Sequence, residues 1–418
     1  MKSYSQAIKI LKKSIITIGN EKIKSSESLN RVTATNIYLK ENYPLADNSS
    51  FDGYAIRSID TKNLSKSRKK LFKILGSIAA GDKPKNLKTK KFQTFEIMTG
   101  GLIPKGFDTI IPIEKVVFYP DKKKPRYIII DKKIKKLQHI RFKGSDFKKK
   151  DLLIKKGTII QSNHVLAFKT FGIQNIKVKK KPKILFFSSG NEIIDKKKIP
   201  YWKIRNSNNF YIQSIKENFL FHFSYGGILR DKDEKLFEKK MRKLIKSKVD
   251  IIITSGAVSA GKFDFIPNVV NKFDLSDYFK GVAIRPGKPI LFAKIKGKQK
   301  AIFGLPGNPI SSAACFRFFV YPYLRKLLGV KNEKPIKAML KKQFTKKRNF
   351  TRFLKSKIHT TKNGKIEVEI LKGQESFRIQ SFLESNIWTL LNSGKSKFKK
   401  NEIVDCFFPN HPNNIFHK

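Results

Sequence analysis

The stretch V-D-I-I-I-T-S-G-A-V-S-A-G, Val249 to Gly261, decides how the central part of this chain folds. Its apolar run predicts a short buried strand, and the glycine-containing run behind it predicts a loop. Two other segments repeat the pattern, I-L-F-F-S-S-G-N-E at Ile184 to Glu192 and I-F-G-L-P-G-N-P at Ile302 to Pro309. Short strands that alternate with glycine loops and helices are typical of an α/β domain with a mostly parallel sheet.

Capping signals predict where the helices of this domain begin. We expect Asn208 to cap one helix and Asp231 the next, since Glu234 follows Asp231 at capping-box spacing. We expect Asn308 to cap a third helix, with Pro309 at its first position.

The flanks of the α/β segment have other patterns. Apolar residues at helical spacing predict a helical region over residues 1–40. Short apolar runs broken by Gly and Pro, such as Thr109 to Pro112 and Tyr127 to Ile130, predict a small all-β unit over residues 70–130, and further short strands are expected after residue 330.

Composition limits the class of protein. The chain has 418 residues, with 90 Lys and Arg against 32 Asp and Glu, a net charge of +58. The lysines are spread along the whole chain, which argues against a nucleic-acid interface and favours a compositional bias toward residues with A/T-rich codons. No apolar run is long enough for a membrane helix, and the N-terminus lacks secretory-signal features, so we expect a cytoplasmic protein. Cys315 and Cys406 are too far apart in the sequence to indicate a disulfide framework or a paired-thiolate zinc site.

Ligands of open α/β sheets bind beyond the carboxyl ends of the strands, and three glycine-containing loops follow such ends here. The start of the helix at Asn308 offers free N–H groups to a phosphate, and the segment Arg285 to Pro289 offers two cations. Glu192, Asp231 and Asp264 would face these anions through a divalent cation. Simpler roles stay open, since Asp231 could be a plain helix cap and Glu192 a turn residue.

Seven motifs in order resemble the MoeA family of molybdopterin molybdenumtransferases, which is related to the E domains of gephyrin and of the plant molybdenum insertase. They are D-N-S-S-F-D-G-Y-A (47–55), I-M-T-G-G (97–101), R-F-K-G-S-D (141–146), S-S-G-N-E (188–192), T-S-G-A-V-S-A-G-K-F-D (254–264), R-P-G-K-P (285–289) and G-L-P-G-N-P-I-S (304–311).

The resemblance implies a multidomain fold that combines α/β and β architecture. Its expected parts are a split elongated mixed domain at 1–46 and 138–176, an inserted β domain at 47–137, a three-layer α/β molybdopterin-binding domain at 177–328 and a C-terminal β-barrel at 329–418. It also implies insertion of molybdenum from molybdate into adenylylated molybdopterin with release of AMP, the last step of molybdenum cofactor biosynthesis. Mg²⁺ or another divalent cation would be needed, and members are homodimers. Molybdopterin adenylyltransferase and apo-molybdoenzymes are suggested as further partners.

The resemblance also transfers roles to particular residues of this chain. Catalytic roles fall to Asp52, Glu192, Asp231 and Asp264, with Asp264 and Glu192 as metal ligands. Molybdate binding falls to Arg285, Lys288, Ser311, Arg352 and Ser376. Substrate binding falls to Thr99, Arg141, Asp146, Ser255, Gly256, Ser259, Pro306, Gly307 and Pro309. Asp52, Thr99, Arg141 and Asp146 are expected to reach the cleft of the partner subunit.

The sequence departs from the family pattern at three positions, and two other functions stay open. Ala257 stands where the family usually has glycine, which predicts a negative φ at this position. Asn191 stands where Asp is more frequent, and Gly281 stands where some members carry a basic residue. One rival is a molybdopterin adenylyltransferase-like enzyme. The other is a basic binding or scaffold protein without catalysis, which the acids of the cleft disfavour.

Overall fold

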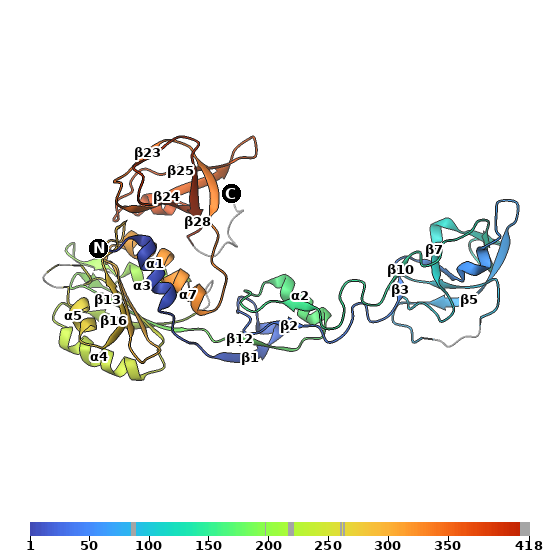
Figure 1. The fold of residues 1–418 in the computed structure, drawn as a ribbon, viewed down its shortest axis with the longest axis horizontal. Helices are drawn as coiled ribbons and strands as arrows, with labels where there is room; N and C mark the ends of the chain where they lie inside the picture. The colour runs from blue at the N-terminus through green and yellow to red at the C-terminus, as the bar shows by residue number, and fades with distance from the viewer. Residues whose placement is uncertain (85–88, 197, 216–220, 260, 262–263, 410–418) are drawn as a thin grey trace. The chain divides into compact units, whose positions relative to one another are not determined.

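A computed structural model describes residues 1–84, 89–196, 198–215, 221–259, 261 and 264–409 of the chain (Figure 1). The chain separates into two compact units. One combines Met1–Thr35, Lys156–Leu166 and Gln174–Lys418, and the other combines Asn36–Lys155 and Ala167–Ile173. No helix of the described residues is long and apolar enough to cross a bilayer.

The first unit contains the expected α/β sheet. Its six strands lie in the order β16 (His222–Leu229), β13 (Lys183–Ser189), β17 (Ile251–Ser255), β21 (Ala301–Leu305), β20 (Leu291–Ile295) and β18 (Leu275–Lys280). The first four strands are mutually parallel, and the last two are antiparallel to their neighbours. The prediction of a mostly parallel sheet is therefore confirmed, with an antiparallel edge.

Helices cover both faces of this sheet, as a three-layer domain requires. Successive residues of a strand point to opposite faces, and β17 follows this rule, with Ile251 and Ile253 in one buried cluster and Ile252 in another. The first cluster is completed by α1 (Tyr4–Lys13), α3 (Ser207–Ile215), α6 (Pro309–Cys315) and α7 (Tyr321–Leu327). The second is completed by α4 (Glu234–Lys246) and α5 (Ile266–Asn271).

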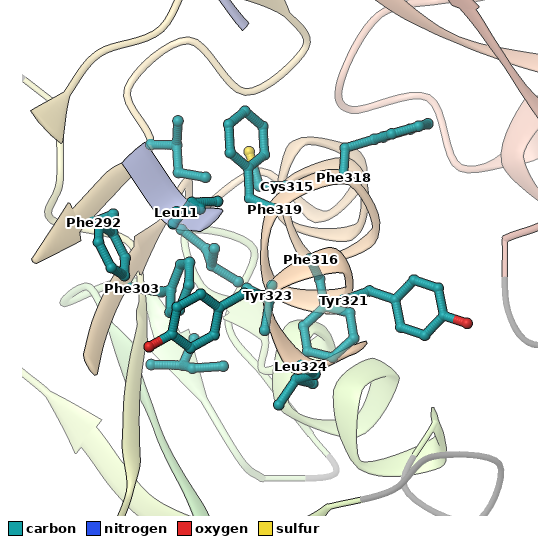
Figure 2. Packing of buried hydrophobic residues seen from close by; sticks show 14 of the residues in the cluster. Leu11, Phe292, Phe303, Cys315, Phe316, Phe318, Phe319, Tyr321, Tyr323 and Leu324 are labelled. Carbon is teal, nitrogen blue, oxygen red and sulfur yellow. The ribbon is translucent and has the colours of Figure 1, made fainter. Parts of the chain in front are cut away.

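A five-residue π-helix, η5 (Phe316–Val320), joins α6 to α7. Figure 2 shows the aromatic side chains that this segment and α7 present to the core. The ring of Tyr323 packs 5.7 Å from that of Phe292 and 5.3 Å from that of Phe303, on strands of the sheet. Phe318 turns the other way and stacks on Phe353 of the C-terminal region, with 4.1 Å between the ring centroids and 8° between the planes. The helix thereby links the α/β core to the C-terminal region.

Several local predictions were wrong. The helix at the N-terminus ends at Lys13, and the chain then forms β1 (Asn20–Lys24), which pairs with β12 (Asn175–Lys179). Asn208 lies inside α3, where its side chain is buried and bonded to the strand-end loops. Asp231 does not cap α4, because Asp233 occupies the cap position and its carboxylate accepts the N–H of Arg230.

The C-terminal region is the expected β-barrel. Five strands form its ring, β24 (Thr351–Thr360), β25 (Ile366–Ile370), β22 (Ile336–Leu340), β28 (Ile403–Phe407) and β26 (Ile387–Leu391). The pairing of β24 with β26 closes the ring. Two shorter strands, β23 (Phe344–Thr345) and β27 (Lys397–Phe398), pair with each other, and α8 (Gln380–Glu384) precedes β26. From the α/β domain, β19 (Ile284–Arg285) pairs in parallel with the start of β24.

The second unit contains a separate mixed sheet. Its strands lie in the order β7 (Thr109–Pro112), β4 (Gly53–Ile56), β6 (Gln93–Ile97), β5 (Lys70–Ile78), β9 (Tyr127–Ile130) and β8 (Val117–Tyr119). β7 and β9 have the bounds that the apolar runs predict. The same unit contains two separate two-stranded sheets, β3 (Asn48–Ser49) with β10 (Ile140–Arg141) and β2 (Ile37–Tyr38) with β11 (Leu152–Ile154). The 3₁₀ helices η2 (Ser58–Thr61) and η3 (Ile113–Lys115) belong to the connections of this unit, whereas η1 (Ser25–Glu27) lies in the first unit and α2 (Ser162–Thr170) contributes residues to both. The exact domain boundaries stay predictions.

Candidate functional site

The carboxyl ends of the parallel strands bring together four loops. Gly256 follows β17 so closely beside β13 that a Cβ on it would lie 2.1 Å from the carbonyl oxygen of Ser189. With φ at +100° as well, this position requires glycine. A Cβ on Gly307, behind β21, would contact the Cα of Gly256 at 3.6 Å. The loops behind three neighbouring strands therefore touch.

Asn208, on α3, links the loop behind β17 to the loop behind β21. Its Nδ2 donates to Ser255 Oγ and to the carbonyl of Gly307, each at 2.7 Å. Ser255 Oγ in turn donates to the carbonyl of Pro306 at 3.1 Å. Of the residues with expected substrate roles, Ser255, Pro306 and Gly307 are thus linked by hydrogen bonds, and the N–H of Gly256 donates to the carbonyl of Leu305 at 2.9 Å, next to Pro306. Ser259 is exposed on the loop behind β17, and Pro309 is the first residue of α6.

The loops behind β13 and β16 are joined by Asn191 and Asp231. The Nδ2 of Asn191 donates to Asp231 Oδ2 at 2.7 Å, and the backbone N–H of Asp231 donates to Asn191 Oδ1 at 3.2 Å. Arg230 holds the same loop by donating to the carbonyls of Gly190 and Ile193 at 3.0 and 2.8 Å. The amide of Asn191 therefore avoids the repulsion that a second carboxylate would create beside Asp231.

The two expected metal ligands are carboxylates that fold back on glycines. A Cβ on Gly190 would lie 2.5 Å from Glu192 Oε2, and a Cβ on Gly261 would lie 2.9 Å from Asp264 Oδ2. The N–H of Gly261 donates to the same Asp264 oxygen at 2.8 Å. Within the described ranges, no three His, Cys, Asp or Glu residues are close enough together to hold a metal ion. The metal roles of Glu192 and Asp264 stay predictions.

The prediction of a negative φ at Ala257 was wrong. Ala257 has φ at +52°, in the left-handed region that disfavours a Cβ. The next side chain, Val258, is 2 % exposed and packs between the sheet and α5. Burial of Val258 therefore favours a chain path in which Ala257 takes an unfavourable backbone conformation.

All five residues with expected molybdate roles line one cavity of ≈ 530 Å³ between the α/β domain and the barrel. We call it the anion pocket. Arg285 and Lys288 come from the segment behind β18, Ser311 from α6, and Arg352 and Ser376 from the barrel. The remaining lining residues are Ile284, Pro286, Gly287, Pro289, Lys347, Phe350, Gln374, Glu375 and Phe377.

Strand pairing sets two guanidinium groups side by side in the anion pocket. Arg285 of β19 is the register partner of Arg352 of β24. Burial, and secondly the charge of Arg285, lowers the pKa of Arg352. Its Nε is buried and finds no hydrogen-bond partner among the described residues. Two like charges held together, one with a buried donor unsatisfied, indicate a site for an anion.

Two contacts of α6 fix the wall of this pocket. A Cβ on Gly287, at φ +103°, would lie 2.4 Å from the sulfur of Cys315, so the Arg-Pro-Gly-Lys turn can approach the helix only through glycine. Asn308 Nδ2 donates to Ser376 Oγ at 3.0 Å. As predicted, Asn308 precedes the helix, but its side chain contacts the barrel and does not cap the helix.

In the second unit, the structure pairs Asp52 with Thr99. The backbone N–H and the hydroxyl of Thr99 both donate to Asp52 Oδ1, at 2.6 and 2.8 Å. These two hydrogen bonds, the backbone one first, lower the pKa of the fully exposed Asp52 carboxyl. The carboxylate is thus held ionised and oriented.

The other two expected residues of this unit lie on its two-stranded part. Arg141 ends β10 opposite Asn48 and lines a second cavity of ≈ 750 Å³ with Tyr43 and Phe171 among its neighbours. Asp146 is exposed, and its N–H donates to the carbonyl of Tyr43 at 3.2 Å. Their side chains have no hydrogen bond to the Asp52–Thr99 pair within the described residues.

The sequence did not single out Lys347, Phe350, Gln374, Glu375 or Phe377 of the anion pocket. The run K-G-Q-E-S-F around Ser376 was the available signal, because the neighbours of Ser376 in one short loop lie close to the same cavity. Lys347 had no comparable signal in a chain with lysines throughout. Asn208 was noticed, but for a capping role that it does not have.

Comparison with models of protein families identifies the class of the central domain. Residues 186–326 match the family model described as a probable molybdopterin binding domain. Residues 2–172 match the MoeA N-terminal region, domains I and II, and residues 337–407 match the MoeA C-terminal region, domain IV.

Proteins that match almost the whole chain belong to the same family as these domain models. The chain is 31% identical over 406 residues to a molybdopterin molybdenumtransferase of Staphylococcus epidermidis, covering 96% of this chain and 94% of that protein. It is 32% identical over 394 residues to the enzyme of the same name from Staphylococcus aureus, covering 93% and 90%. A crystal structure of the molybdopterin biosynthesis MoeA protein from Pyrococcus horikoshii superposes with a TM-score of 0.83 at 27% identity, covering 98% of this chain and all of that one. The chain belongs to the MoeA family of molybdopterin molybdenumtransferases.

Proposed function

We propose that this chain is a transferase that inserts molybdenum from molybdate into adenylylated molybdopterin and releases AMP. The observation that carries the proposal is the anion pocket, in which Arg285 and Arg352 are register partners and Lys288, Ser311 and Ser376 line the same cavity. Molybdate is a dianion, and hydrogen bonds from charged donors are the strong ones for an oxyanion.

The charges of the site indicate which part of it binds molybdate and which part binds the adenylylated pterin. The cations of the anion pocket hold and orient molybdate, and Ser311 and Ser376 supply hydroxyl donors to its oxygens. The adenylylated pterin lies along the glycine loops behind β13, β17 and β21, where close backbone approach suits a phosphate. Bringing two anions together is the main electrostatic obstacle, and fixed donors aimed at the developing charge lower it.

Glu192 and Asp264 would hold the divalent cation, for which Mg²⁺ is the expected ion. When bound, such an ion polarises the phosphoanhydride that links the pterin phosphate to AMP. Asp231 keeps the Glu192 loop in place through Asn191. An oxygen of water or of molybdate would attack one phosphorus and form the new P–O bond while the bridging P–O bond breaks, so AMP leaves with one phosphate and the pterin keeps the other.

Assembly and location are part of the proposal. Asp52 and Thr99 lie in a different compact unit from the α/β cleft, and we infer that they complete the cleft of a partner subunit in a homodimer. An isologous pair of subunits would then contain two equivalent composite sites. A cytoplasmic enzyme of this kind would receive its substrate from a molybdopterin adenylyltransferase and deliver its product to apo-molybdoenzymes.

The direct test is AMP release by the purified protein. Adenylylated molybdopterin, molybdate and Mg²⁺ should together yield AMP, and omission of molybdate should reduce the yield of active cofactor to background, as measured by reconstitution of an apo-molybdoenzyme. Formation of adenylylated molybdopterin from ATP, without molybdenum insertion, would instead identify an adenylyltransferase.

A further inference from the structure

Three lysines are buried within the described part of the chain, which is unusual for an ammonium group. Lys355 is 1 % exposed, Lys346 6 % and Lys300 8 %. Each ammonium donates to backbone carbonyls. Carbonyl acceptors satisfy the N–H groups without cancelling the positive charge.

Lys355 holds the loop that carries Ser376. Lys355 lies on β24, and its Nζ donates to the carbonyls of Gly373, Arg378 and Glu375 at 2.7, 3.0 and 3.2 Å. All three acceptors belong to the segment that contributes Gln374 to Phe377 to the anion pocket. One ammonium therefore uses its three N–H bonds to close a single loop over the barrel.

Three further hydrogen bonds hold the same loop. Gln374 accepts the backbone N–H of Lys355 at 3.0 Å and donates to the Lys355 carbonyl at 2.8 Å. Ser381 Oγ donates to the carbonyl of Gly373 at 2.7 Å. The loop is thus fixed at its start and its middle, and Lys355 is the part of this network that carries charge.

Lys346 holds a second barrel loop, residues 347–350, in the same way. Its Nζ donates to the carbonyl of Phe350 at 2.8 Å and to that of Lys347 at 3.4 Å. Lys347 and Phe350 both line the anion pocket. Lys346 also lies near Arg352, whose charge adds to desolvation in lowering the pKa of Lys346.

Lys300 provides an internal contrast. It donates to the carbonyls of Ser247 and Val249 and immediately precedes β21, at the amino end of the parallel strands. The ligand loops lie at the carboxyl ends. Lys300 is therefore a buried, carbonyl-bound lysine that is remote from any ligand-binding loop.

We propose that Lys346 and Lys355 are positioning residues of the molybdate pocket, each of which fixes one barrel loop that lines the cavity. This inference rests on the proposed function, because it takes molybdate as the occupant of the anion pocket. Burial lowers the pKa of Lys355, with Glu375 opposing and Arg378 assisting. Its ammonium is nevertheless the form that makes the three carbonyl contacts.

The test replaces each lysine by methionine, which is unbranched and of similar length. Lys355→Met and Lys346→Met should each raise the molybdate concentration for half-maximal AMP release about tenfold, because each loosens a loop that lines the pocket and the loss of one charge-assisted contact made by such a loop costs about that factor. The KM for adenylylated molybdopterin and kcat at saturating molybdate should stay within about twofold. Lys300→Met is the matched control and should lower thermal stability while leaving the molybdate response unchanged.

Calorimetric titration of molybdate alone into each protein gives a readout independent of turnover, and the same tenfold weakening is expected there. If Lys355→Met does not fold, Ser381→Ala loosens the same loop and should shift the molybdate response in the same direction. An unchanged molybdate response in every folded variant of these loops, or an equal shift in Lys300→Met, would overturn the inference. If Arg352→Ala also leaves molybdate binding unchanged, the proposed function fails as well; if only Arg352→Ala weakens it, the inference alone is wrong.

Discussion

The anion pocket and the acidic loops of the α/β sheet hold their charged groups in different ways. In the pocket, strand pairing sets Arg352 beside Arg285, and buried lysines fix the neighbouring loops. At the carboxyl edge of the sheet, Glu192 is exposed and Asp264 bonds to the backbone of its own turn. The cations are held by long-range packing, whereas the carboxylates are held by local turns.

This difference predicts which group determines which step. A pocket whose donors are fixed in advance recognises its anion without rearrangement, so its residues should control affinity for molybdate. Loop carboxylates that are held only by their own turns and gain further partners with substrate and cation should control the rate. The variants below separate these two contributions.

The largest effect is expected for Asp264→Ala. Loss of a ligand that positions the cation should lower kcat for AMP release by at least about a hundredfold, since a bound metal contributes several kcal/mol to the transition state. The half-saturating molybdate concentration should not change. Asp274→Ala is the control, because Asp274 is an exposed carboxylate of the same unit whose ion pair is with Lys296. A normal kcat in Asp264→Ala would remove the metal role.

Arg352→Ala should give the complementary result. Loss of one charged donor costs about 1.5–3 kcal/mol, which corresponds to a tenfold to hundredfold rise in the molybdate concentration for half-maximal turnover. The affinity for the adenylylated pterin should be nearly unchanged. Weaker pterin binding with normal molybdate dependence would reassign the barrel to the pterin.

Mixed dimers extend the comparison to the second unit. If Asp52 completes the cleft of a partner subunit, an Asp52→Ala subunit paired with an Asp264→Ala subunit contains one intact composite site. Each homodimeric variant should be nearly inactive, and the heterodimer should recover about half of the wild-type activity. Stable heterodimers without activity would show that each site is built from a single chain.

Ala257→Gly tests the backbone of the cleft. The left-handed φ of +52° at Ala257 is unfavourable for an L-residue by about 1 kcal/mol. Glycine should relieve this strain, so the free energy of unfolding should rise slightly or stay constant despite the greater freedom of the unfolded chain. A clear loss of stability in chemical denaturation would show that the Ala257 methyl group contributes packing that outweighs the strain.

Thr99→Val has the smallest expected effect, a shift in one titration. Thr99 lowers the pKa of Asp52 through its N–H and its hydroxyl. The pair therefore stabilises the fold above the ordinary pKa of an Asp, and this contribution is lost as the pH falls through the lowered value. Valine keeps only the N–H bond, so the Asp52 pKa should rise part of the way back, as measured by carbon-detected NMR titration. An unchanged Asp52 titration would mean that the hydroxyl contributes nothing.

The architecture could be predicted to the extent that it depends on local pattern. Apolar runs identified β13, β17 and β21, and the strands β7 and β9 have the predicted bounds. Caps were less predictable because Asn and Asp bond equally well to distant groups. Asn208 bonds to Ser255, and Asn308 bonds to Ser376, contacts that depend on chain segments far away in sequence.

The candidate site also contains residues that the sequence predicted and residues that only the fold reveals. Motifs identified the glycine loops, and the family resemblance identified five lining residues of the anion pocket, which the fold brings together: Arg285, Lys288, Ser311, Arg352 and Ser376. The supporting lysines could not be found, because Lys346 and Lys355 look like any of the other lysines until strand β24 and the loops are placed around them. The backbone at Ala257 was mispredicted because burial of Val258 overrides local preference.

Direct binding of molybdate, without the pterin, tests the division of labour most simply. Calorimetric titration of wild type, Asp264→Ala and Arg352→Ala should give equal dissociation constants for the first two and a tenfold to hundredfold weaker one for the third. Added salt should weaken all three, since the cations lie near solvent and screening acts over about 8–10 Å. Equal binding by Arg352→Ala and wild type, or loss of binding in Asp264→Ala alone, would contradict the account.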